Sequence, residues 1–260
     1  MNPASTIIGF GIIALVLVGA IRFFMHRKVA SDNDGSKSSA KLPWSWVDAF
    51  TVGAVIFLGP QLFFGSVVSS QESDSAAAKF FLVFAIEAAT VALLWAFLKR
   101  RGASLKVLGF RRPHLKDVVY ILAGYALYFI TLITTLAIAT HLFPHFNEGQ
   151  VQTTGFEQAA GSSLFLTFFA LVIFPPIAEE MLFRGFLYQG LKQRFTKVVS
   201  AIMVGLLFGF AHGQWNVAID TFILSTVMII VFEKSKNLWV NIGLHALKNC
   251  IAFAALYLYK

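Results

Sequence analysis

The chain has 260 residues, of which 57% are hydrophobic and only 13% are charged, and its mean hydropathy is +0.73. Soluble domains carry roughly 25% charged residues, so this composition excludes an ordinary soluble globular protein. The formal net charge of +8 could indicate nucleic-acid binding. Basic residues that orient membrane spans and attract anionic lipid explain this charge better. We therefore expect the lipid bilayer, and no nucleic acid, as a partner.

Apolar stretches of about 20 residues recur along the chain, which is the length that a helix needs to cross a bilayer core of about 30 Å. The sequence therefore predicts an all-α, polytopic integral membrane protein with about eight transmembrane helices and a polar cavity within the bundle. The sixth and seventh stretches are short for full spans. The expected spans are residues 6–24, 47–68, 77–98, 118–142, 163–188, 198–212, 217–232 and 238–259.

The connecting segments predict the orientation of the chain. With the amino terminus outside, most of the 21 Lys and Arg residues fall in inner loops, so the positive-inside rule predicts that both termini lie outside. Residues 29–42 are polar and Ser-rich, which indicates a flexible inner loop. Trp44 and Trp46, which follow it, are typical of residues at the membrane interface. The length and the lack of targeting signals favour a bacterial cell membrane.

Two adjacent glutamates and an arginine occur in the fifth span, as Glu179, Glu180 and Arg184. An ionised side chain at the bilayer centre costs roughly 2.5–3.5 kcal/mol, so such residues indicate a functional site. Glu180 and Arg184 are four residues apart and can form a supporting ion pair. Glu179 is rotated by about 100° from Glu180, which suggests a free reactive carboxylate. The alternative is that all three residues form one structural charge cluster.

The prolines of Pro175-Pro176 precede these glutamates in the fifth span. Proline removes a backbone donor and clashes with the preceding turn, so we expect the helix to break or kink there. The glutamates would then lie in the first turn of a resumed helix, where the helix dipole favours negative charge.

Of the six histidines, four lie in loops or near helix ends and are expected to be solvated, which leaves His212 and His245 as candidates. Asn241, His245 and Asn249 are spaced by four residues and share one helical stripe. A glutamate and a histidine can activate water as general bases, and a second histidine and an asparagine can stabilise an oxyanion. A metal site of Glu179, His212 and His245 is stereochemically possible, but nothing in the spacing requires it.

Other motifs narrow the chemistry. The chain has no Gly-x-Ser-x-Gly, no Cys–His pair at membrane depth and no His-Glu-x-x-His, which argues against serine, cysteine and zincin-type proteolysis. Glu87, Asp220 and Lys248 also fall in predicted spans. Glu87 either lines the cavity or, as we prefer, forms a hydrogen bond to a neighbouring helix in protonated form. Asp220 lies near the outer boundary, and Lys248 either pairs with an acid such as Asp220 or extends to the interface.

The order Glu-Glu-x-x-x-Arg, Phe-x-x-x-His and His-x-x-x-Asn, each in an apolar segment, resembles the CPBP family over residues 161–255. These CAAX-protease and bacteriocin-processing, Abi-like membrane endopeptidases include the type II CAAX prenyl endopeptidases. The resemblance implies that Glu179 and His212 activate the attacking water, while His245 and Asn249 form the oxyanion hole. The ion pair expected beside Glu179 would support it. The resemblance also implies that no metal is obligatory, with zinc as the alternative.

We therefore divide the chain into residues 1–46, an amino-terminal transmembrane helix with a polar inner loop, residues 47–160, variable transmembrane helices, and residues 161–257, a catalytic membrane domain. The resemblance implies an intramembrane endopeptidase that acts on a peptide or protein at the membrane, such as a CAAX-like, lipidated or bacteriocin-type substrate. The alternatives are a non-catalytic immunity or scaffold protein on the same fold, a zinc-dependent variant of the protease, and a proton-coupled transporter.

Overall fold

The computed structural model describes residues 42–68, 75–142, 154–212 and 215–258, and within these residues it contains helices and no strand. The expected first span and nearly all of the polar loop 29–42 lie outside the described residues. The helices are α2 (Trp46–Val68), α3 (Ala76–Arg100), the 3₁₀ helix η1 (Leu105–Leu108), α4 (Leu115–Leu142), α5 (Ser163–Phe168), the π-helix η2 (Phe169–Ile173), α6 (Phe174–Glu180), the π-helix η3 (Met181–Tyr188), α7 (Gln189–Leu191), α8 (Lys197–Phe210), α9 (Trp215–Ser235) and α10 (Leu238–Tyr257).

Five helical segments of the described part are long and apolar enough to cross a membrane. They are Trp46–Phe63, Ala76–Arg100, Leu115–Leu142, Ser163–Leu191 and Leu238–Tyr257. The expected sixth span corresponds to α8, which has 14 residues and is too short for a simple crossing. The prediction of an all-helical, multi-pass membrane protein is confirmed, whereas the count of eight spans is not.

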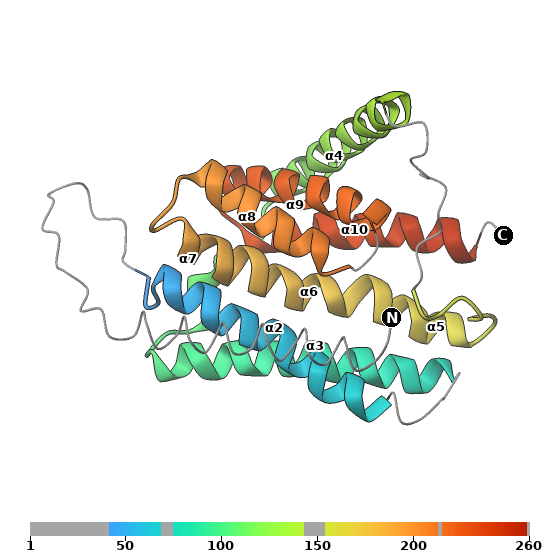
Figure 1. Ribbon diagram of the computed structural model, residues 1–260, viewed down its shortest axis with the longest axis horizontal. Helices are drawn as coiled ribbons and strands as arrows, with labels where there is room; N and C mark the ends of the chain where they lie inside the picture. The colour runs from blue at the N-terminus through green and yellow to red at the C-terminus, as the bar shows by residue number, and fades with distance from the viewer. Residues whose placement is uncertain (1–41, 69–74, 143–153, 213–214, 259–260) are drawn as a thin grey trace, which may run out of the picture.

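The segment from α5 to α7 runs through the middle of the bundle (Figure 1). Helices α2 and α3 pack on one side of it, and α8, α9 and α10 lie on the other. Helix α4 packs against α9 and α10, and its far end projects away from the other helices. This arrangement surrounds the segment that carries the two glutamates with helices on both sides.

The helix continues through the two prolines, so of the expected break or kink the break is wrong. Helical structure is continuous from Ser163 to Leu191, and Pro175 and Pro176 lie in the first turn of α6. The π-helix η2 directly precedes this turn, so the missing N–H groups are ones that would otherwise bond to carbonyl oxygens of η2. Glu179 and Glu180 therefore end α6 rather than begin a helix, and the helix dipole does not explain their position.

Trp44 is buried inside the protein, a position that the sequence did not predict. Its side chain is 2% exposed, and its Nε1 donates a hydrogen bond of 3.2 Å to the carbonyl oxygen of Phe186 in η3. A Cβ on Gly190 would lie 2.3 Å from the Cβ of Ala49, so only glycine permits this contact between α7 and α2. The start of α2 is thus locked against the central helix.

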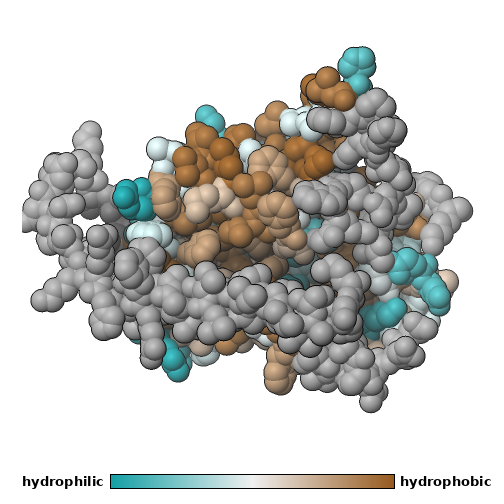
Figure 2. Space-filling view, in the orientation of Figure 1, coloured by the Kyte–Doolittle hydropathy of each residue, from teal (hydrophilic) through white to brown (hydrophobic). Residues whose placement is uncertain are grey.

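Large apolar side chains lie on the outer faces of the helices, where a membrane protein meets lipid. Figure 2 shows these apolar residues gathered over the middle of the bundle, with hydrophilic residues toward its two ends. Val119, Ile130 and Phe210 are each more than half exposed. Such surface is costly in water but not against acyl chains, so it agrees with a bilayer environment.

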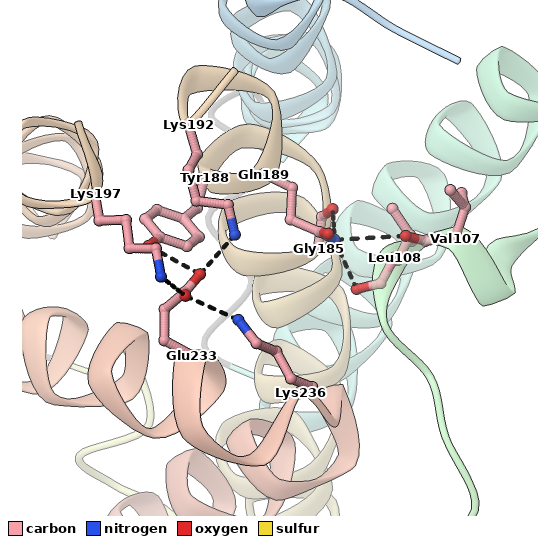
Figure 3. A network of polar contacts seen from close by, with 9 residues as sticks. All are labelled: Val107, Leu108, Gly185, Tyr188, Gln189, Lys192, Lys197, Glu233 and Lys236. Atoms are coloured by element: carbon pink, nitrogen blue, oxygen red, sulfur yellow. Dashed lines mark hydrogen bonds and ion pairs between the residues drawn. The ribbon is translucent and has the colours of Figure 1, made fainter. Parts of the chain in front are cut away.

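A polar network joins the basic end of the bundle (Figure 3). Glu233, in the last turn of α9 and beyond the apolar stretch 217–232, forms ion pairs with Lys192, Lys197 and Lys236. Burial alone would raise the pKa of Glu233, but hydrogen bonds from the three lysines lower it well below its usual value. On the other side, Gln189 donates to the carbonyl oxygens of η1 and of Gly185. These contacts tie α7, α8, α9 and η1 together.

Candidate functional site

A cavity of about 180 Å³ lies between the central helix, α9 and α10. Its walls include Glu179 at the end of α6, His212 just after α8, and His245 and Asn249 on α10. The structure therefore brings together the four residues that sequence reasoning proposed as catalytic. His212 reaches the cavity because α8, which has 14 residues, ends just before it.

Glu179 is the accessible carboxylate of the pair. Its side chain is 22% exposed, and among the described residues its Oε2 accepts no hydrogen bond. Nε2 of His245 lies 3.9 Å from this oxygen. A buried carboxylate without donors is costly, so this oxygen is the atom most ready to accept a proton from a molecule in the cavity.

Glu180 and Arg184 form the ion pair expected from their spacing. Arg184 Nη1 lies 2.7 Å from Glu180 Oε1, and both side chains are 0% exposed. The same carboxylate oxygen lies 3.0 Å from the Nδ1 of His245, a contact that the sequence did not predict. The guanidinium also lies over the ring of Phe208, 4.5 Å from its centroid, so a cation–π contact adds to the pair.

The two histidines are held in defined ring positions. Nδ1 of His212 lies 2.8 Å from the carbonyl oxygen of Phe208, and because a carbonyl only accepts, this nitrogen carries the hydrogen. Nε2 of His212 is then the basic nitrogen. Nδ1 of His245 likewise donates to Glu180, since Glu180 is ionised against Arg184. The Phe208 ring packs edge-on against both imidazoles.

Asn249 repairs the hydrogen-bond defect that the prolines create. Pro175 and Pro176 have no N–H, so the carbonyl oxygen of Leu171 lacks a helical donor four or five residues on. Asn249 Nδ2 donates to that oxygen at 2.9 Å. An amide has two N–H groups, so the second one remains for a ligand in the cavity. Asn241, on the same stripe, instead donates to the Met228 carbonyl at 2.8 Å and has a structural contact.

The structure also locates two polar residues, Lys248 and Glu87, whose partners the sequence left open. Lys248 lines the cavity and pairs with Asp220, which settles the choice between pairing and reaching the interface. In the sequence, the fact that Lys248 directly precedes Asn249 was the feature that could have predicted its place in the cavity wall. Glu87 lines a separate, mainly apolar pocket with Ile177 and Ala178, and no hydrogen-bond partner for it is found in the described part of the chain.

The geometry does not form a ready zinc site. Within the described ranges, no group of three or more His, Cys, Asp and Glu side chains is close enough to hold a metal ion. The ligands expected for a zinc-dependent variant were Glu179, His212 and His245. One imidazole nitrogen of each histidine has a protein partner, which leaves Nε2 of both rings without a hydrogen-bond partner in the described part of the chain. The metal requirement stays a prediction for experiment.

The fold and the cavity define a multi-pass membrane protein with a glutamate–histidine site within its helical bundle. Residues 161–251 match the model of the Rce1-like family, described as type II CAAX prenyl endopeptidase Rce1-like. This match confirms the family resemblance predicted from the three motifs, and it covers about a third of the chain. The Rce1-like family is a protease family, so the match supports endopeptidase activity. Comparisons with curated proteins and with solved structures gave no match.

Proposed function

We propose that this protein is an intramembrane endopeptidase of the CAAX-protease type, which hydrolyses a peptide bond near the membrane with an activated water. The observation that carries this proposal is the placement of Glu179, His212, His245 and Asn249 around one cavity. The family match over the same residues supports it independently of the geometry. A bound water could be approached from two sides, by the unpartnered oxygen of Glu179 and by the basic nitrogen of His212.

The proposed reaction has two stages. In the first, Glu179 and His212 remove a proton from water as its oxygen attacks the peptide carbonyl, which becomes an oxyanion. In the second, the oxyanion collapses, the C–N bond breaks, and the proton passes to the leaving nitrogen. The products are a carboxylic acid and an amine, so atoms and charge balance.

The oxyanion needs hydrogen-bond donors. Asn249 has one N–H free of its bond to Leu171. His245 can donate from Nε2 only as an imidazolium, since its Nδ1–H is already directed at Glu180. Glu180 would offset the charge of that form and hold the ring in place, and Arg184 keeps Glu180 in position, which gives the pair its supporting role.

We propose that the reaction takes place in a bacterial cell membrane. The basic end of the bundle, formed by Lys192, Lys197 and Lys236, would face the inner side, which puts both termini outside. The proposed substrate is a peptide or protein at the membrane, either CAAX-like and lipidated or of the bacteriocin-precursor type.

The test is cleavage of a library of membrane and lipidated peptides by the purified, detergent-solubilised protein, analysed by mass spectrometry. Wild type is compared with Glu179→Gln and His212→Ala, with and without a metal chelator. Asp48→Asn serves as a control, because it removes the charge of a carboxylate that pairs with Arg101 and does not line this cavity.

We expect cleavage by wild type and by the control, loss in both site variants, and survival in chelator. Loss in chelator with recovery on adding zinc would assign ligand roles to the glutamate and the histidines. A folded wild type that cleaves nothing, together with a cellular function that survives Glu179→Gln, would favour the non-catalytic scaffold.

A further inference from the structure

A lysine stands in the wall of the cavity beside the proposed catalytic residues. Lys248 lies on α10, one residue before Asn249 and three after His245, so it shares a helical face with His245. Its side chain is 12% exposed. It lines the same cavity as Glu179, His212 and His245, so its charge lies close to the proposed reacting groups. The three family-like motifs assign no role to this residue.

The lysine is held by a chain of polar contacts from two other helices. Its Nζ lies 3.1 Å from Oδ2 of Asp220 on α9, and Oδ1 of the same carboxylate accepts a hydrogen bond from the hydroxyl of Tyr128 on α4. Both oxygens of Asp220 are thus engaged. The side chain of Asp220 is 21% exposed, so the arrangement is half-buried and neutral overall.

This arrangement leaves donors on the lysine for a ligand. An ammonium has three N–H groups, and Asp220 is the partner found for it within the described residues. A lysine needed only to neutralise Asp220 would have no physical reason to reach the cavity wall, where desolvation is costly. In the cavity its remaining N–H groups are available to an anionic group of a ligand.

We propose that Lys248 is a specificity-determining residue that binds a carboxylate of the substrate within the cavity; this inference rests on the proposed endopeptidase function. The carboxylate belongs either to the chain terminus of the substrate or to an acidic side chain. Three residues of helix rise by about 4.5 Å, so an anion at Lys248 lies close to the level of His245. Cleavage would then occur within a few residues of the bound carboxylate.

The experiment uses one fluorescent hydrophobic decapeptide in matched forms. The first pair has a free terminal carboxylate or a terminal amide, and the second pair has Asp or Asn near the carboxyl end with the terminus amidated. We measure KM and kcat for each form with wild type. A charge-assisted contact of this kind is expected to lower KM for one acidic form by about 10-fold relative to its neutral partner, with kcat little changed.

The variants separate binding from folding. Lys248→Met alone would leave Asp220 unpaired, so the key variant is the double substitution Lys248→Met with Asp220→Asn, in which Asn can still accept from Tyr128. We expect the double variant to lose the preference for the acidic form. Lys248→Arg is expected to retain it, and so is Asp220→Asn alone, because both keep a cation in the cavity wall.

The outcomes for this inference and for the proposed function are distinct. Equal KM values for both peptide pairs in active wild type would overturn the role of Lys248 and leave the endopeptidase standing. If no peptide is cleaved, fluorescence anisotropy still compares binding of the acid and amide forms to wild type and to the double variant. Equal binding of all forms there would overturn the inference as well.

Discussion

The two adjacent glutamates allow a matched experiment, because the same substitution by glutamine removes one charge from two very different environments. Glu180 is 0% exposed and lies 2.7 Å from Arg184, which is also 0% exposed. Removing one partner of a buried ion pair typically costs about 3–5 kcal/mol, because the other charge is left without compensation. Glu180→Gln should therefore lower the free energy of unfolding by about that amount.

Glu179→Gln should behave in the opposite way. Its side chain is 22% exposed and its Oε2 has no hydrogen-bond donor among the described residues, so a neutral amide loses no contact there. We expect a change in unfolding free energy within about 0.5 kcal/mol, as for substitutions away from packed features. Loss of a general base should lower kcat by roughly 10²–10⁴-fold.

Both quantities can be measured on the same preparations. Unfolding of the purified protein by SDS titration in mild detergent, followed by circular dichroism, gives the difference in free energy, and peptide cleavage gives kcat. The reasoning is refuted if the two variants lose equal stability, or if Glu179→Gln keeps wild-type kcat. Glu180→Gln with wild-type stability would show that the ion pair contributes nothing to the fold.

Three other predictions follow from single contacts. Asn249→Ala should leave the Leu171 carbonyl without a donor and cost about 1–3 kcal/mol in the same unfolding assay, and an unchanged free energy would contradict this account. Gly209→Ala should also lower the free energy of unfolding by about 1–3 kcal/mol, because the new Cβ would lie 2.8 Å from the backbone oxygen of Ala218 and push α8 away from α9. An unchanged free energy would show that the two helices can move apart without cost. The pKa of Glu233 is lower in the folded state than in the unfolded chain, so its stabilisation is present above about pH 4.3 and is lost as the pH falls toward the folded value. Wild type should therefore lose stability below that pH more steeply than Glu233→Gln, and parallel pH profiles would argue against the lysine network.

Much of the site could be predicted from the sequence because charge in an apolar segment is rare and costly. Glu179, His212, His245 and Asn249 were identified in this way, and the structure places them around one cavity. The spacing of Glu180 and its arginine was enough to predict their pairing, since residues four apart on a helix are neighbours. The roles of these residues in catalysis stay predictions.

Prediction from the sequence failed where a contact depends on a segment that is far away along the chain. The prolines indicated a break, yet the helix continues, because a π-helical turn precedes them and Asn249, 78 residues from Leu171, supplies the missing donor. The sequence could not predict that Trp44 is buried. Its side chain bonds to the backbone of Phe186 and packs in the space left by Gly190, which has no side chain.

Local chemistry therefore determined the class of this protein, its helices and its candidate catalytic residues, since hydropathy and helical periodicity act over a few neighbouring residues. Tertiary structure alone decided which partner each polar group takes. It placed His245 against Glu180 and held Lys248 with Asp220 in the wall of the cavity. The physical reason is that a buried polar group must find a donor or acceptor wherever the packing of helices brings one, and sequence distance does not limit that choice.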